Sequence, residues 1–190
     1  SAAAQPKKGG TNIAAATTGY TDVMDPHTSL NQAGSLWSFI GNTPLRTTRD
    51  LTKLSNELVE KWEIPGNGQE ILLTIRQGVT WHNKPPSNGR AFVADDLAFS
   101  LTRITGKLNP EKAASFQRAS TLPNFESATA VDEKTVRVKL TAPHSSFING
   151  LAEWRNSVVP RDFVEKGGKF EEPATMVGTG PFVADVWENN

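Results

Sequence analysis

The chain has 190 residues, and its 20 lysines and arginines balance its 20 aspartates and glutamates. This balance leaves no basic surface of the kind that binds nucleic acid, so we expect no nucleic-acid partner. The absence of cysteine excludes disulfides, thiolate metal ligands and cysteine nucleophiles, and no apolar run approaches the roughly 20 residues that cross a bilayer.

The chain begins with small and polar residues. Residues 1–10 read SAAAQPKKGG and are expected to form a flexible tether. They contain no hydrophobic signal core, so the chain as given is expected to be either mature or cytoplasmic. A remnant of cloning explains residues 1–4 equally well.

The first part of the chain predicts a strand and a helix. Residues 11–17 are small and apolar enough for a buried strand, and residues 18–22 break it with turn-forming side chains. Apolar side chains recur at helical spacing over residues 30–40, which predicts an amphipathic helix that buries Trp37. Residues 45–49 are expected to form a short strand at a sheet edge.

The centre of the chain predicts a hairpin followed by a long helix. Residues 70–76 alternate apolar and polar side chains, as in a strand with one buried face. The Asn-Gly pair at 67–68 predicts the turn that joins this strand to the stretch 58–64. After a loop with two prolines at 84–89, Asp95 is expected to cap a helix. The apolar face of that helix carries Leu97, Leu101 and Ile104.

A second hairpin is predicted after this helix. Residues 109–110, Asn-Pro, end the helix, and residues 113–118 are expected to form a short helical or loop segment. Strands are expected at 125–131 and 135–141, joined by a polar tip at 132–134.

The last part of the chain predicts two short helices. Residues 143–146 are expected to cap the first, whose apolar side chains include Trp154 at helical spacing. Residues 158–160 predict a short strand, and residues 161–166 predict a helix closed by the two glycines that follow.

No group of residues has the spacing of a catalytic or metal site. His27, His82 and His144 lie far apart, and His82 is expected to be a structural histidine at a strand end. Residues 178–180 lack the third glycine and the lysine of nucleotide-binding loops, and there is no Gly-x-Ser-x-Gly motif. A helix start explains the aspartates at 95–96 better than acid–base catalysis does. We therefore expect no enzyme, no metal and no cofactor.

Several motifs, in order along the chain, are shared with one family of bacterial proteins. They are MDPH at 24–27, IRQGVTWHN at 75–83, Pro85, ADDLAFS at 94–100, VDEKTVRVKLTAPHSSF at 131–147 and VGTGPF at 177–182. In these motifs the chain resembles the extracellular solute-binding proteins of family 5, the peptide, nickel and sugar receptors of bacterial ABC importers. It departs from the family pattern at Lys84, where a glycine is usual, and in a slightly longer loop before Ala94.

The resemblance implies an α/β (mixed) fold, with a lobe like that of type II periplasmic binding proteins and an extra α+β subdomain. Family members are far longer, with a second large lobe after the glycine motif, so the chain is expected to hold an incomplete, N-terminal portion. The expected parts are a tether at 1–10, the first part of the main lobe at 11–44, the extra subdomain at 45–160, and the return to the main lobe at 161–190.

The resemblance also implies where a ligand would lie. In the family, the loop after the first strand faces the ligand, which here indicates Thr18, Gly19, Tyr20, Thr21 and Asp22. The loop after the long helix also turns toward the cleft, which indicates Ser115, Phe116 and Gln117. A surface turn explains Tyr20 about equally well, and core packing is favoured over ligand contact for Trp154, an aromatic beside Arg155. The crossover into the main sheet, where hinges are expected, corresponds to Gly178, Thr179 and Gly180.

The function implied by the resemblance is capture of a short peptide or similar small solute outside the cytoplasm. The expected partners are ABC permease subunits, with a lipid anchor holding the receptor at the membrane surface. One alternative is a stand-alone interaction or assembly module that associates with itself through exposed strand edges. Another is a hydrolase with an unrecognised site, which would need a perturbed carboxylate in a deep pocket.

Overall fold

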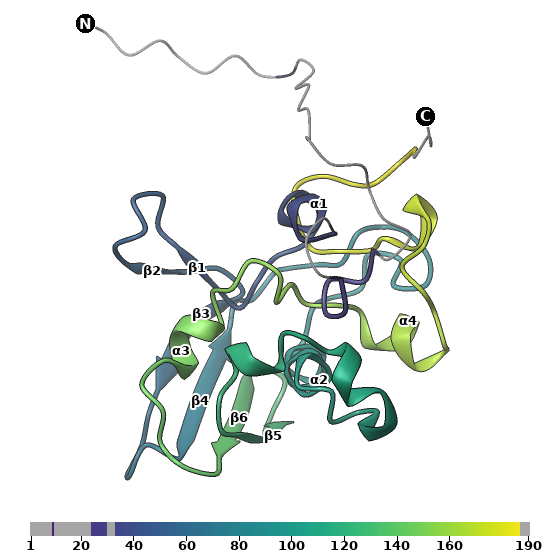
Figure 1. The fold of residues 1–190 in the computed structure, drawn as a ribbon. Coiled ribbons are helices and arrows are strands. Elements are labelled where there is room, and N and C mark those ends of the chain that lie inside the picture. The colour runs from purple at the N-terminus through teal and green to yellow at the C-terminus, as the bar shows by residue number, and fades with distance from the viewer. Residues whose placement is uncertain (1–8, 10–23, 30–32, 187–190) are drawn as a thin grey trace, which may run out of the picture.

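The computed structural model describes Gly9, residues 24–29 and residues 33–186. The predicted strand at 11–17 and the predicted ligand loop at 18–22 lie outside the described residues. The described chain forms one larger sheet and a separate two-stranded ribbon, and Figure 1 shows the helices on one side of the larger sheet.

The centre of the fold is a four-stranded antiparallel sheet with the strand order β3-β4-β6-β5. The strands are β3 (Val59–Glu63), β4 (Glu70–Ile75), β6 (Thr135–Leu140) and β5 (Phe125–Ala130). In β4, Ile71, Leu73 and Ile75 are buried while their neighbours are only half-buried, which confirms the alternation predicted for this strand. Both predicted hairpins are confirmed, because β3 pairs with β4 and β5 pairs with β6.

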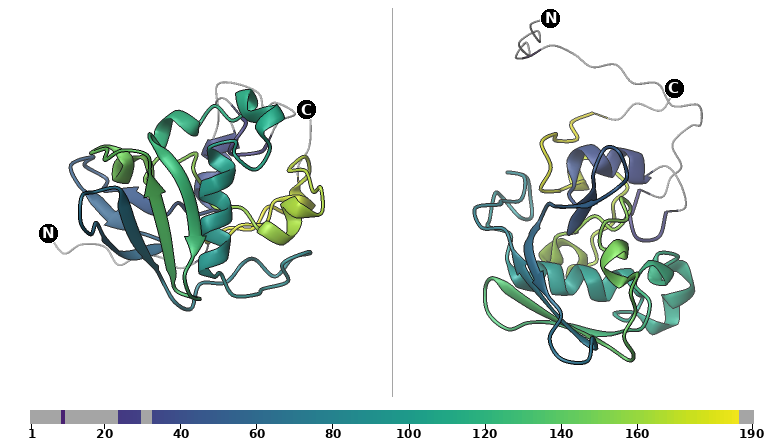
Figure 2. Two further views of the ribbon diagram at one scale, coloured as in Figure 1. Left: turned by 90° about the horizontal axis from the view of Figure 1, so that it is seen from below. Right: turned by 90° about the vertical axis from the view of Figure 1, so that its left-hand side faces the viewer.

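Helix α2 (Ala94–Ile104) covers one face of this sheet (Figures 1 and 2). Its predicted apolar side chains are fully buried, and they belong to the same apolar cluster as the inward side chains of β4 and β6. Burial of each such side chain contributes roughly 1.5–3 kcal/mol, so the contact between helix and sheet is the main source of stability in this part of the fold.

The turn between β3 and β4 depends on two glycines. Gly66 and Gly68 have φ values of 64° and 82°, a region that L-residues with a side chain rarely adopt. The predicted Asn-Gly turn is therefore present as a longer loop, in which a glycine on each side of Asn67 has the positive φ.

The strand predicted at 45–49 is shorter than predicted, and it does not lie at an edge of the main sheet. Strand β1 (Leu45–Thr47) pairs with β2 (Leu54–Asn56) in a separate two-stranded ribbon. Figure 1 shows this ribbon projecting from the sheet, with its connecting loop at the tip.

The prediction that Asp95 caps α2 is wrong. The helix begins at Ala94, and Asp96 Oδ2 accepts a hydrogen bond from the backbone N–H of Val93 at 3.2 Å. Asp96 is the third residue of the helix, and from there its carboxylate reaches back to the residue before the first turn. Asp95 instead faces outward and forms an ion pair with Arg161.

Two further predictions for the last part of the chain are wrong. The helix expected to carry Trp154 is a single turn, α3 (Phe147–Gly150), and Trp154 is 41% exposed rather than packed in the core. The helix does not continue, because the Gly150 carbonyl accepts from the Glu153 N–H and, at 2.9 Å, from the Asn156 side chain. Residues 158–160 form no strand, since the N–H of Val159 is bound by the Ser100 hydroxyl rather than by a neighbouring strand.

The remaining helices are short. Helices α1 (Ala33–Ile40) and α4 (Arg161–Glu165) agree with the predicted ranges within the described residues, and Gly167 follows α4 with φ 76°. Three 3₁₀ turns are η1 (Pro110–Ser115), η2 (Ala119–Thr121) and η3 (Pro173–Thr175). Among the described residues, no helix combines the length and apolar character that crossing a membrane requires.

A second apolar cluster joins the beginning of the described chain to its end. Trp37 is fully buried in it, as predicted, and its indole N–H donates to the Met24 carbonyl at 2.7 Å. The ring of Phe170 meets Trp37 edge-on at 5.3 Å between centroids. The cluster consists of Met24, Trp37, Ile40, Phe99, Val159, Phe163, Phe170 and Met176.

Candidate functional site

A cavity of about 570 Å³ lies where the second apolar cluster meets the C-terminal half of α2. Its apolar lining is Met24, Phe99, Leu108, Phe116, Val164 and Phe170. Its charged lining is Asp25, Arg103, Lys112, Glu165, Lys169 and Glu171. The walls therefore come from α2, η1, α4 and two segments, 24–28 and 168–171, that are far apart in sequence.

This cavity brings together part of the predicted ligand-binding residues. Ser115 and Phe116 line it, whereas Gln117 does not. Met24 and Asp25, which also line it, follow closely after the predicted loop at 18–22, which lies outside the described residues. Ser115 and Phe116, from one predicted ligand loop, thus face the same cavity as Met24 and Asp25, which follow the other predicted loop.

Arg103 connects these two segments. Its guanidinium forms an ion pair with Asp25, in which Nη1 lies 2.9 Å from Oδ1 and Nη2 contacts Oδ2. Its central carbon also lies 5.3 Å from the centroid of the Phe116 ring. Burial alone would raise the pKa of Asp25, but the hydrogen bonds and charge of Arg103 hold that pKa below its ordinary value. One buried cation therefore fixes both sides of the cavity floor.

His27 completes this network as a neutral side chain. Arg103 Nη1 donates to Nδ1 at 2.8 Å, so the ring hydrogen is on Nε2, which donates to the Ser157 carbonyl at 2.8 Å. Burial, followed by the nearby positive charge of Arg103, lowers the pKa of His27 to about 3. His27 therefore anchors the segment 24–29 without adding charge to the cavity.

The neutral state of His27 makes the protein sensitive to acid. The unfolded chain protonates His27 below its ordinary pKa of 6.5, whereas the folded chain does so only near its pKa of about 3. The free energy of unfolding should therefore fall as the pH drops below 6.5, by about 1.4 kcal/mol per pH unit from this group. Urea unfolding at pH 7, 6 and 5 would measure this loss. A His27→Gln variant should show a flatter dependence, and an equal dependence in both proteins would contradict the assignment.

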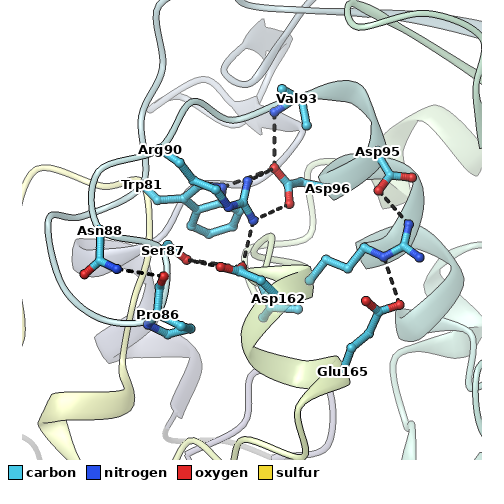
Figure 3. A network of polar contacts seen from close by, with 12 residues as sticks. Trp81, Pro86, Ser87, Asn88, Arg90, Val93, Asp95, Asp96, Asp162 and Glu165 are labelled. Carbon is cyan, nitrogen blue, oxygen red and sulfur yellow. Dashed lines mark hydrogen bonds and ion pairs between the residues drawn. The ribbon is translucent and has the colours of Figure 1, made fainter.

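A second polar network holds α4 against the beginning of α2 (Figure 3). Arg90 donates to both carboxylate oxygens of Asp96, at 2.7 and 2.8 Å, and to Asp162 of α4 at 2.8 Å. The Trp81 indole also donates to Asp96, at 3.2 Å. Partial burial would raise the pKa of Asp162, yet the hydrogen bond and charge of Arg90 keep the pKa of Asp162 below its ordinary value. Because Val164 lies on the same helix turn as Asp162, this network places one wall of the cavity.

The predicted crossover glycines are held by His82. Its backbone N–H donates to the Gly178 carbonyl at 2.9 Å, and its Nδ1 accepts from the Gly178 N–H at 3.2 Å. The ring hydrogen is therefore on Nε2, which donates to the Gly180 carbonyl at 2.8 Å. The structural role predicted for His82 is confirmed. Residues 177–182 form no strand in the described chain but hydrogen-bond to the end of α1, through Gly180 to Ile40 at 2.9 Å.

Trp154 lies apart from the cavity. It lines a different, smaller groove of about 350 Å³ beside the β1–β2 ribbon, and the Arg155 guanidinium stacks over its ring at 4.6 Å. Sequence reasoning missed Asp25 and Arg103 as site residues, although the MDPH motif contains the first of them. Within residues 24–29 and 33–186, histidine and acidic side chains nowhere gather in the threes that a metal ion would need.

Comparison with known proteins adds to this geometry. A family model described as bacterial extracellular solute-binding proteins, family 5 Middle, matches residues 53–190. The dipeptide-binding protein of Escherichia coli (strain K12) is 32% identical over 150 residues, which are 73% of this chain and 28% of that protein. Heme-binding protein A of Haemophilus influenzae is 30% identical over 146 residues, 70% of this chain and 26% of that protein. The chain thus spans about a quarter of the length of these relatives.

Solved structures share the fold. A dipeptide-binding protein from Pseudoalteromonas in complex with Met-Leu has a TM-score of 0.73 at 21% identity, and covers 87% of this chain and 35% of its own. The ABC transporter-associated periplasmic binding protein DppA from Helicobacter pylori, in complex with the peptide STSA, has a TM-score of 0.73 at 25% identity. The alignment with it also covers 87% of this chain and 35% of that structure.

Proposed function

Since the chain belongs to the bacterial extracellular solute-binding proteins of family 5, we propose that the whole protein captures a short peptide or a similar small solute for an ABC importer. The similarity to a dipeptide-binding protein favours a peptide as the solute. The predicted fold class, mixed α/β of the type II periplasmic binding proteins, is confirmed by the solved relatives.

One observation indicates where the solute would bind. Ser115 and Phe116, which the family resemblance assigns to the ligand side, line the cavity that also receives the segment beginning at Met24. Arg103 binds both segments, so the floor of the cavity is built before a ligand arrives. Preformed walls reduce the entropy that binding costs, as a receptor for small solutes requires. This cavity would be the share of the binding site that the first lobe contributes.

We base the proposed partners and compartment on the same family membership. The whole protein would bind its solute outside the cytoplasm, in the periplasm or at the outer face of the membrane, and deliver it to permease subunits. A lipid anchor would hold it there. The family is described as extracellular, and the Helicobacter pylori relative is called periplasmic, which supports this placement.

We also propose that the chain divides as the family resemblance implies, with residues 45–160 as an extra subdomain. In support, the larger apolar cluster lies almost wholly between Leu45 and Val158. The second cluster instead joins Met24 and Trp37 to residues from Val159 onward. Phe99 on α2 reaches into this second cluster, so the subdomain and the main lobe would share one packed boundary.

Titration calorimetry on the whole protein tests the proposal, with the dipeptide Met-Leu and the tetrapeptide STSA as probes. We expect saturable binding of at least one probe, and a free energy of unfolding higher by roughly 2.7 kcal/mol at 100 times Kd. A whole protein that binds neither peptide and forms dimers through β3 or β5 would overturn the proposal and favour the assembly module.

A further inference from the structure

We propose that Asn67 is a site of spontaneous deamidation, in which its side-chain amide is lost as ammonia without an enzyme. The chain contains three Asn-Gly pairs, at 67–68, 88–89 and 149–150. The fold restrains the second and third pairs and leaves the first able to react. The reaction needs no solute and no reactant but water, so it is independent of the proposed function.

The reaction begins with an attack of the glycine nitrogen on the asparagine side chain. The backbone nitrogen of Gly68 forms a bond to Cγ of Asn67, the Cγ–Nδ2 bond breaks, and ammonia leaves with the proton of the Gly68 amide. Water then opens the cyclic imide at either of its carbonyls, which leaves aspartate or isoaspartate. Glycine after the asparagine favours the attack, because it has no Cβ to hinder the approach and permits more backbone conformations.

The side chain of Asn67 is accessible and suitably polarised. Asn67 is exposed, its Oδ1 accepts from the Gln69 backbone N–H at 3.2 Å, and its Nδ2 contacts the Gln69 side chain. When the glycine nitrogen attacks Cγ, negative charge develops on Oδ1, and the Gln69 N–H is placed to stabilise that charge. The contacts with Gln69 therefore help the attack.

The backbone of this turn is weakly held. The Gly68 N–H donates to the Pro65 carbonyl at 3.5 Å, which is the limit of a hydrogen bond. Gly66 and Gly68, on the two sides of Asn67, both have positive φ, and a Cβ added at Gly66 would meet no atom within 4 Å. The turn can therefore move until the nitrogen reaches Cγ, at little cost in free energy.

The pair at 88–89 is restrained by contacts with distant segments. The Gly89 N–H donates to the His82 carbonyl at 3.1 Å. At the beginning of the same loop, the Lys84 ammonium donates to the carbonyls of Pro173 and Ala184, at 2.7 and 2.6 Å. Attack by the Gly89 nitrogen would require this loop to open.

The pair at 149–150 is restrained by a helix and by close packing. The Gly150 N–H donates to the Ser146 carbonyl at 3.1 Å at the end of α3. A Cβ added at Gly150 would lie 1.8 Å from the carbonyl oxygen of Thr121, so the backbones of these two segments are in direct contact. The Gly150 nitrogen therefore cannot approach the Asn149 side chain unless this part of the fold opens.

Mass spectrometry of tryptic peptides measures the three rates in one sample. Trypsin places the three pairs in separate peptides, which are residues 62–76, 77–90 and 140–155. In the folded whole protein, we expect Asn67 to react at least about 10-fold faster than Asn88 and Asn149. In the same protein unfolded in urea, the three rates should become similar, because the restraints on the second and third pairs are gone. An equal rate at Asn67 and Asn88 in the folded protein would overturn the inference.

The chemistry of the product and a variant complete the test. The product at Asn67 should contain isoaspartate, whereas aspartate alone would mean direct hydrolysis of the amide and would rule out the attack by Gly68. Asn67→Gln is the matched control, since its longer side chain would have to close a larger ring, and the peptide 62–76 of this variant should keep its mass. A variant peptide that changes mass as fast as the wild type would place the reaction elsewhere in residues 62–76.

Discussion

Replacement of Arg90 by alanine should lower the free energy of unfolding by about 3 kcal/mol. The variant leaves the carboxylate of Asp96, whose side chain is 3% exposed, without the fork that binds both of its oxygens. Only the Trp81 indole and the Val93 N–H would still donate to it. A buried charge without its partner is costly, and the one-third exposure of Arg90 keeps the expected loss at the lower end of the usual range.

Urea unfolding of the wild type and the variant measures this loss. Arg161→Ala is a matched control, because Arg161 also joins α4 to the beginning of α2, through Asp95, and pairs with Glu165 within α4. The side chains of both of those partners are about half exposed, so the control should cost no more than about 1 kcal/mol. Similar losses in the two variants would show that burial of Asp96 does not determine the strength of the network.

The variant Gly178→Ala should destabilise the fold by about 3 kcal/mol or more. A Cβ at this position would lie 1.8 Å from the carbonyl oxygen of Ile40 and 2.7 Å from its carbonyl carbon. Both neighbours are backbone atoms at the end of α1, so no side-chain rotation relieves the overlap. The segment would have to move away from α1, and the hydrogen bonds of His82 to Gly178 and Gly180 would be lost with it.

Thr179→Ala provides the comparison within the same segment. It removes one hydrogen bond, from the Thr179 hydroxyl to the Asn42 side chain at 2.9 Å, and should cost about 1 kcal/mol. Hydrogen exchange of the amides of His82 and Gly180 would report directly whether the segment has opened. If the two variants were equally stable, the end of α1 would be able to move away from residue 178. The close contact between Gly178 and the Ile40 carbonyl would then not constrain the fold.

The sequence predicted those elements whose pattern is local. The alternation in β4 and β6 is repeated every second residue, and the turns beside them contain glycine or aspartate, so neighbouring residues suffice to identify both hairpins. The cap of α2 could not be predicted in this way, because two aspartates stand at the helix start. Asp96 becomes the cap because Trp81 and Arg90, from the preceding loop, surround its carboxylate.

The candidate site was predictable only in part, for the same physical reason. Ser115 and Phe116 were indicated by the family motif, and they do line the cavity. The pair between Asp25 and Arg103 joins residues 78 positions apart, and nothing in either local pattern selects one among many possible partners. Trp154 has helical spacing from Phe147, yet the Gly150 carbonyl is bound by the Glu153 N–H and the Asn156 side chain, so the helix ends before it reaches the tryptophan.

The long-range contacts of the first described residues have a consequence for how the chain folds during synthesis. His27 bonds to a residue 130 positions later, and Asn42 to one 137 positions later. Helix α1 therefore emerges from the ribosome well before its partners, by roughly 7–27 s at about 5–20 residues per second. The sheet and α2 can form in that interval, and α1 should become protected from proteolysis last, although it is made first.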